Sequence, residues 1–126
     1  MPSVETIEKF ILAVEQDAHD EVIERFYTED ASIQENQNPP RVGRDNLIEN
    51  ERKMLKKALS VHSECLRPYF ISGKHVAIRW KFSIEWLDGS FTEIEEMVMQ
   101  EWRSEKIYKE RFFYDPKQFT PQKKEE

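Results

Sequence analysis

Cysteine is nearly absent from this sequence of 126 residues, in which Cys65 stands alone. One thiol cannot close a disulfide within the chain, so the core alone must hold the fold, and a reducing compartment such as the cytoplasm is expected. Long apolar runs are also missing, and the first residues lack the basic-then-apolar pattern of a signal peptide. We therefore expect no membrane span and no membrane partner. The length predicts one domain, which buries roughly 68% of the surface of its unfolded chain.

Histidine and excess positive charge are scarce as well. The histidines are His19, His62 and His75, and their spacing does not match that of metal ligands, so no metal site is expected. The net charge is −6, from 19 basic and 25 acidic residues that are well mixed. Nucleic acids require a clustered basic face, so they are not expected partners. Neither a glycine-rich phosphate loop nor a G-x-S-x-G motif occurs, and we expect no cofactor.

What the sequence does have is a strict alternation over residues 76–86, VAIRWKFSIEW. Every second residue is apolar, and Trp80, Phe82 and Trp86 are aromatic. A period of two is typical of a β-strand with one buried face. Because the aromatic content exceeds what packing on one short helix needs, we predict a central strand of a curved sheet that faces a core or pocket.

The remaining elements follow from periodicity and turn residues. Helices are predicted after the capping residue Ser3, at about residues 20–26, and from Arg44 or Asp45 to a last buried position at Leu59. His19, at the junction of the first two helices, is expected at the surface or at a cap. Strands are predicted at 31–35, 61–71, 76–86, 91–102 and 107–114, with hairpin turns at Gly73 and Gly89.

This order of elements predicts an α+β fold. Three helices from the N-terminal half pack on a strongly curved, mainly antiparallel sheet and form a cone with an internal pocket. The domain is predicted to span residues 1–116, and residues 117–126 are predicted to be a polar, frayed C-terminal tail.

Several short motifs within this order carry a family resemblance. They are FYTEDA at residues 26–31, ENQNPP at 35–40, GRD at 43–45, Trp102, and RFFYDP at 111–116. Together they resemble the SnoaL-like branch of the nuclear transport factor 2-like superfamily. The resemblance implies an α+β cone and a homodimer formed through the open sheet face. It leaves the activity open, because the fold hosts isomerases, cyclases, epoxide hydrolases, dehydratases and non-catalytic binders.

Glu35 is the first candidate for chemistry. Compared with ketosteroid isomerase, which has the same fold, Glu35 falls where that enzyme has its proton-shuttling carboxylate. A carboxylate that faces an apolar pocket has a raised pKa and can serve as a base. The enzyme's two hydrogen-bond donors fall at Phe10 and Val98, which cannot donate, so steroid isomerisation by that arrangement is not expected. The alternative is that Glu35 is exposed or caps a loop.

The strand over residues 91–102 and His62 supply further candidates. If Val98 points inward, Glu96 and Gln100 share its face and either orient a ligand or pair with arginines or each other. Met97 and Met99 would then lie on the opposite face and suit a dimer interface. His62, with Glu64 two residues on, could act as an acid–base pair if that face is inward; the alternative is an exposed sheet residue.

Three functions remain open. The first is a cofactor-independent enzyme that performs acid–base chemistry on a small apolar molecule bearing a carbonyl, with Glu35 as base and Gln100 or His62 positioning the substrate. The second is a non-catalytic small-molecule binder, and the third is a dimeric scaffold whose own side chains fill the hollow. The expected ligand-binding residues are Phe10, Trp80, Glu96, Val98, Gln100 and Phe113.

Overall fold

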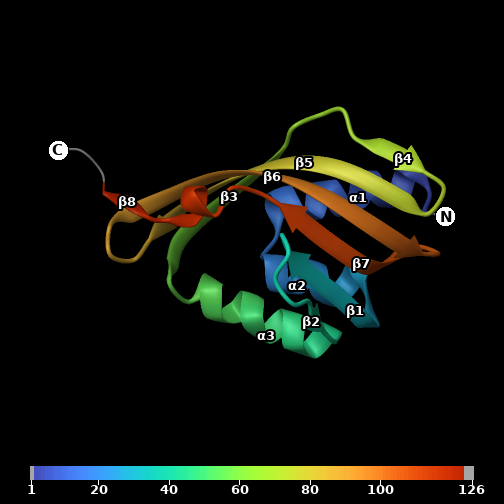
Figure 1. The fold of residues 1–126 in the computed structure, drawn as a ribbon, viewed down its shortest axis with the longest axis horizontal. Helices are drawn as coiled ribbons and strands as arrows, with labels where there is room; N and C mark the ends of the chain where they lie inside the picture. Colours follow the sequence, from blue (N-terminus) through green and yellow to red (C-terminus); the bar gives the residue numbers. More distant parts are fainter. Residues whose placement is uncertain (1, 124–126) are drawn as a thin grey trace.

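The computed structural model describes residues 2–123. Figure 1 shows two layers, with the long strands curving over the helices and the two ends of the chain at opposite ends of the molecule. The helices are α1 (Val4–Gln16), α2 (His19–Phe26), α3 (Arg44–Leu55) and a short 3₁₀ helix η1 (Pro116–Phe119). The strands are β1 (Tyr27–Glu35), β2 (Arg41–Val42), β3 (Ala58–Cys65), β4 (Phe70–Ser72), β5 (His75–Trp86), β6 (Ser90–Arg103), β7 (Lys106–Phe113) and β8 (Gln122–Lys123). The predicted α+β cone is confirmed.

The helices begin and pack as their sequences predict. Ser3 caps α1, its hydroxyl accepting the Thr6 N–H at 3.1 Å. The apolar stripe of α1, which includes Ile7, Phe10 and Ile11, is buried against the sheet. Not one of the helices in residues 2–123 has the length and apolar character needed to cross a membrane.

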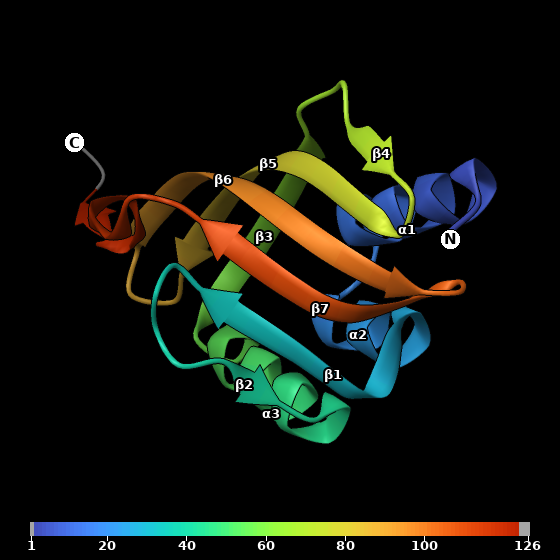
Figure 2. The same cartoon turned by 45° about the vertical axis from the view of Figure 1, so that its right-hand side comes forward.

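The sheet is mixed, with the strand order β2-β1-β7-β6-β5-β3, while β4 pairs with β5 and β8 with β6. Neighbouring strands are antiparallel except β1 and β7, which run parallel. Figure 2 shows β1, β7, β6 and β5 side by side as one curved surface. The parallel pair places β1, the first strand, next to β7, the last long strand. Residues far apart in the sequence therefore border the same interior.

The alternation in the two longest strands is confirmed. In β5, Val76, Ile78, Trp80 and Ile84 are buried, and the residues between them are exposed or half-buried. In β6 the inward phase is the one that contains Val98, so Met97 and Met99 lie on the outer face. The inward residues of β6 are Thr92, Ile94, Glu96, Val98, Gln100 and Trp102.

Several element boundaries differ from the prediction; β1, for example, begins at Tyr27 and not at residue 31. Residues 61–71 were expected to form one strand, but they contain the end of β3, a loop with Pro68, and the start of β4. Proline has no N–H for the ladder, which explains the break. Leu59 was expected on the buried side of the third helix, yet α3 ends at Leu55 and Leu59 is an exposed residue of β3.

Strand β7 contains one extra residue. Trp102 of β6 pairs with Ile107, but Glu101 pairs with Lys109, so Tyr108 has no partner of its own. Such a β-bulge reverses the inward and outward positions of the residues that follow it. Consequently Glu110 and Phe112 point inward, and the exposed ring is that of Phe113.

The segment after β7 is ordered in part. Asp115 caps η1 through the Lys117 N–H, and β8 pairs with the start of β6, where the prediction was a frayed tail. Residues 124–126 of the predicted tail lie outside the described residues. The ordered part places Phe119 over the hollow of the cone.

Candidate functional site

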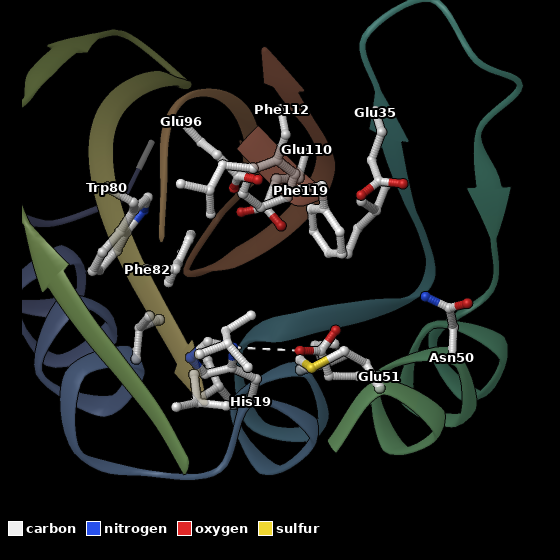
Figure 3. A pocket seen from close by; sticks show the side chains of 18 of the residues that line it. His19, Glu35, Asn50, Glu51, Trp80, Phe82, Glu96, Glu110, Phe112 and Phe119 are labelled. Carbon is white, nitrogen blue, oxygen red and sulfur yellow. Dashed lines mark ion pairs between the residues drawn. The ribbon is translucent and has the colours of Figure 1, made fainter. Parts of the chain in front are cut away.

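A cavity of about 560 Å³ lies between the sheet and the helices, and we call it the main cavity. Its wall combines aromatic and aliphatic side chains with polar groups, which include four carboxyl groups and the cations of Arg41, Lys53 and Lys57 (Figure 3). The aromatic side chains on its wall are Phe10, Tyr27, Trp80, Phe82, Trp86, Phe112 and Phe119, and the acidic ones are Glu35, Glu51, Glu96 and Glu110. A cavity of this size could hold a small molecule.

The aromatic wall is built by packing between neighbouring elements. On β5, Trp80 stacks on Phe82 with ring centroids 5.7 Å apart. On α1, the Phe10 ring meets Trp102 edge-on at 5.8 Å and Phe26 at 5.4 Å. These contacts hold the rings in place, so the apolar surface that a ligand would meet is already formed.

Glu96 is a buried polar group without a partner in the described part of the chain. Its side chain points from β6 into the main cavity, is 7% exposed, and makes no hydrogen bond or ion pair with any described residue. Burial raises the pKa of Glu96 to about 8, and the negative charges of Glu35 and Glu110 add to this. At neutral pH the group is therefore a carboxylic acid that can donate a hydrogen bond.

Glu110 is buried to the same degree but fully partnered. It accepts hydrogen bonds from the Tyr27 hydroxyl and from the Gln100 amide, the latter at 2.6 Å, and Gln100 in turn accepts the Trp102 indole N–H at 3.0 Å. Burial raises the pKa of Glu110 to about 7, while the two donors act in the opposite direction. This network ties β1, β6 and β7 together behind the cavity wall.

Glu35 lies at the end of β1, on the rim of the main cavity. A guanidinium N–H of Arg41 donates to its carboxylate at 3.2 Å, and both side chains are about one-third exposed. The other buried donor of Arg41, its Nε–H, has no hydrogen-bond partner among the described residues. Tyr114 lies nearby, and burial together with the charge of Glu35 raises its pKa to about 12. The rim therefore offers a ligand the Glu35 carboxylate as acceptor and the Arg41 Nε–H as a free donor.

On the helix side, His19 and Glu51 border the main cavity (Figure 3). His19 Nδ1 lies 3.4 Å from a carboxylate oxygen of Glu51, and both side chains are mostly shielded from water. His19 was expected at the surface or at a cap. It is half-buried because α2 turns its first residue toward the sheet, where the ring meets Phe82 at 5.6 Å.

The predicted site residues separate into three groups. Phe10, Trp80, Glu35 and Glu96 line the main cavity, as expected. Val98 and Gln100 point inward but are covered, and the amide of Gln100 is occupied by Glu110 and Trp102. His62 and Phe113 are exposed on the outer face of the sheet, because β3 turns Ser63 inward and the bulge in β7 turns Phe112 inward.

Sequence reasoning missed many of the cavity residues, among them Glu51, Glu110, Phe112 and Phe119. The hydrophobic stripe of α3 is weak, with only Leu47 and Ile48 buried. Glu51 lies four residues after Leu47, so helical spacing places it on the inner face, but its charge led sequence reasoning to pass over it. Glu110 and Phe112 were missed because they follow the bulge in β7, which reverses the faces to which they point.

No three His, Cys, Asp or Glu side chains in residues 2–123 converge in a way that could hold a metal ion.

Sequence comparisons identify no relative: no family model and no curated protein matches the chain. Solved structures do match. One is a protein with a ketosteroid isomerase-like fold from Catenulispora acidiphila, in complex with trimethylamine, at a TM-score of 0.76 and 13% identity, covering 92% of this chain and 89% of that chain.

Two further matches come from named proteins. A protein described as a SnoaL-like polyketide cyclase from Jannaschia matches at a TM-score of 0.72 and 13% identity, covering 90% of this chain and 85% of that chain. TerC, co-crystallised with polyporic acid, matches at 0.76 and 14% identity, covering 94% and 95%. At such identities the likeness concerns the fold alone. The chain therefore has the cone fold of SnoaL-like and ketosteroid isomerase-like proteins, the fold of the nuclear transport factor 2-like superfamily.

Proposed function

We propose that this protein is a cofactor-independent enzyme that moves a proton on a small, largely apolar molecule bearing a carbonyl group. The observation that carries the proposal is Glu96: a carboxyl group with no partner, 7% exposed, on the wall of an aromatic cavity. Because its pKa is raised to about 8, it holds a proton at neutral pH. An acid in this state can donate to a carbonyl oxygen and stabilise the negative charge that develops there.

Glu35 is the proposed base. Its carboxylate borders the same cavity, and Arg41 fixes its position at 3.2 Å. In the proposed step Glu35 removes a proton from the carbon next to the carbonyl, the electron pair moves toward oxygen, and Glu96 stabilises the resulting enolate by its hydrogen bond. Return of the proton from Glu35 to a different carbon gives an isomer. Attack of the enolate carbon on a second carbonyl within the molecule closes a ring instead, and the alkoxide formed takes the proton back from Glu35. His62 has no part in this step because it is exposed on the outer face of the sheet.

Two structural neighbours hold small molecules, trimethylamine in one and polyporic acid in the other, and a third is described as a polyketide cyclase. Those ligands and that reaction belong to the neighbours. They support the use of the hollow in this fold as a small-molecule site, and the cavity volume of about 560 Å³ fits the same use. A cavity of that volume speaks against the third hypothesis, a scaffold whose own side chains fill the hollow.

A non-catalytic binder is the second candidate. The observation that favours it is the ion pair between Glu35 and Arg41, because the guanidinium already occupies the carboxylate that would have to take up a proton. In that case Glu96 and the free Nε–H of Arg41 would orient a ligand, and the aromatic rings would provide most of the affinity.

A cytoplasmic homodimer remains part of the proposal. Met97, Met99 and Phe113 are 40–47% exposed on the outer face of β6 and β7, where they form an apolar area suited to a second copy of the chain. Analytical ultracentrifugation of the wild type and of Met97→Glu tests this part on its own. We expect a dimer for the wild type and a monomer for the variant.

The catalytic proposal is tested by hydrogen exchange on a ketone probe, 2-tetralone, in D₂O. NMR measures the replacement of protons next to the carbonyl by deuterium, and titration calorimetry measures binding. We expect the wild type to accelerate exchange. Glu35→Gln should lower that rate by about 10²–10⁴-fold while affinity changes only a few-fold. Glu96→Gln should lower it by about 10²–10³-fold.

Glu93→Gln is the matched control, since Glu93 is exposed on the outer face of the same strand. This variant should accelerate hydrogen exchange on 2-tetralone as much as the wild type does. Binding of the probe without accelerated exchange would favour the binder. Accelerated exchange that survives in Glu35→Gln would refute the assignment of Glu35 as base.

A further inference from the structure

Ser63, His19 and Glu51 are aligned in the order of a nucleophile, a base and a carboxylate. The Ser63 hydroxyl lies 2.9 Å from His19 Nε2, and the other ring nitrogen, Nδ1, lies 3.4 Å from Glu51 Oε1. A carboxylate beside Nδ1 favours the tautomer that is protonated there, which leaves Nε2 able to accept the Ser63 proton. The edge-on contact of the ring with Phe82 restricts its rotation. The acid–base step proposed above uses none of these three residues.

Ser63 and His19 of this alignment border a cavity other than the main cavity. A second cavity of about 290 Å³ is lined by Ser63 and His19, with apolar groups of Leu55 and Ala58 among its other walls. His19 also lines the main cavity, so it stands between the two spaces. Ser63 is only 4% exposed at the bottom of the second cavity, so a small acyl group would fit it better than a bulky one.

Backbone donors lie beside this cavity. Asp17, Ala18 and His19, where α1 ends and α2 begins, line it. No side chain caps α2, and the first N–H groups of a helix have no acceptor within the helix. Asp20 lies within the first turn of α2, where its carboxylate accepts from Arg52 at 3.0 Å. The Asp17 N–H donates to the Ala13 carbonyl, so the donors beside the cavity are the N–H groups of Ala18 and His19. Unused N–H groups near a nucleophile are suited to stabilise an oxyanion.

We propose that Ser63 and His19 form a second catalytic site, with Glu51 as positioning residue, that hydrolyses small acyl esters. Ser63 Oγ bonds to the ester carbonyl carbon while His19 Nε2 takes its proton. The carbon–oxygen bond to the alcohol then breaks, and the alcohol leaves with that proton. Water attacks the acyl-serine, giving a proton to His19 that returns to Ser63 as the acid departs. One ester and one water thus yield one acid and one alcohol.

Two nearby side chains provide controls. Cys65 is also a nucleophile on β3, but burial raises the pKa of its thiol and it does not line the second cavity. Ser60 lines the same cavity but has no hydrogen bond to a histidine. If the chemistry depends on His19, only Ser63 should react.

The experiment uses an alkyl fluorophosphonate, which bonds to an activated serine with loss of fluoride, and 4-nitrophenyl acetate as a small ester. Mass spectrometry of peptides locates the label, and circular dichroism verifies that each variant is folded. We expect labelling at Ser63 in the wild type, in Ser60→Ala and in Cys65→Ala. Ser63→Ala should lose the label and the esterase activity, and His19→Gln should label about 10²-fold more slowly or less. Glu51→Gln should label at least about tenfold more slowly.

Three outcomes would overturn the proposal: no label on the folded wild type, a label on Ser60 or Cys65 in place of Ser63, or a label on Ser63 that forms equally fast in His19→Gln. Since the readout is a covalent bond to a named serine, it does not depend on whether the main cavity catalyses proton transfer. A failure here therefore leaves the proposed function in place.

Discussion

Tyr27 and Glu110 lie 83 positions apart in the sequence, and the hydroxyl of one donates a hydrogen bond to the carboxylate of the other in the interior of the protein. The pKa of Tyr27 is raised well above its usual value, first by burial and then by the charge of Glu110. The bond joins the first and last long strands, β1 and β7, where they run parallel. It stabilises the closure of the cone next to the main cavity.

Replacing Tyr27 by Phe should destabilise the protein. The variant removes one of two donors to a buried carboxylate, and leaving such a group under-satisfied costs about 1–3 kcal/mol. The same loss should raise the pKa of Glu110 further, since the Tyr27 bond lowers it. Urea unfolding followed by circular dichroism measures the free energy of unfolding.

Tyr108→Phe makes the same chemical change in β7, where Tyr108 is half-buried and stacks under Arg103 at 3.8 Å. A phenyl ring keeps that contact, so we expect a change within about 0.5 kcal/mol. Equal losses in the two variants would mean that the Tyr27–Glu110 bond contributes nothing specific.

Stability should fall as the pH rises from about 5 to about 8. Glu96 titrates near 4.5 when unfolded and near 8 when folded, so between these values the folded protein holds a proton that the unfolded chain has lost. The unfolded state is favoured increasingly through this window, by at most about 1.4 kcal/mol per pH unit for each such group. Glu110, with a pKa of about 7, adds to the slope in the lower part of the window.

Glu96→Gln removes the larger of these two effects, because an amide does not titrate. Chemical unfolding at pH 5, 6, 7 and 8 should give a shallower slope for this variant than for the wild type. Glu93→Gln should follow the wild type. Parallel curves for the wild type and Glu96→Gln would show that Glu96 is ionised at neutral pH in the folded protein.

Trp80→Ala should weaken both the fold and the site. The ring is 2% exposed and stacked on Phe82, and its removal should cost roughly 3–5 kcal/mol. Trp80→Phe keeps an aromatic ring and should lose much less. Thermal unfolding and calorimetric binding of 2-tetralone check the two effects. A cost near zero would contradict the buried position of this ring.

Phe112 and Phe113 test which face of β7 meets a ligand. Phe112 lines the main cavity, whereas Phe113 is on the outer face beneath Arg111, 4.8 Å from its guanidinium carbon. Phe112→Ala should reduce probe affinity at least about tenfold, as expected for the loss of a buried ring contact. Phe113→Ala should bind like the wild type, and the reverse result would place the bulge elsewhere.

Strict alternation made the sheet predictable. In β5 an unbroken period of two identifies the buried face of the strand, and through it Trp80 as a cavity residue. In β6 the sequence left two phases open, and Glu96 faced the cavity only in the phase that turns Val98 inward, which is the one observed. Buried faces are set by the hydrophobic effect acting on individual side chains, so the sequence carries that information locally. The helices with clear stripes were predictable for the same reason.

The pairing of distant groups was not predictable from local patterns. His19 opens α2, Ser63 is in β3 and Glu51 is in α3. Only the packing of all three elements brings Ser63 within hydrogen-bond distance of His19 and the Glu51 carboxylate within 3.4 Å of the other ring nitrogen. Phe113 was expected in the pocket because a bulge leaves no mark on the alternation of apolar residues. The free carboxyl of Glu96 could be placed on the inner face, but whether a partner would reach it depended on the whole fold.

Tyr108, the unmatched residue of β7, governs the electrostatic character of the interior. If Tyr108 were paired in regular register, with no bulge, the alternation from Ile107 would send Lys109 and Arg111 inward in place of Glu110, and two cations would join the remaining carboxyl groups of the hollow with no side chain exchanged. In a fold of this kind, ligand preference can therefore change through the register of one strand as well as through mutation of the lining itself.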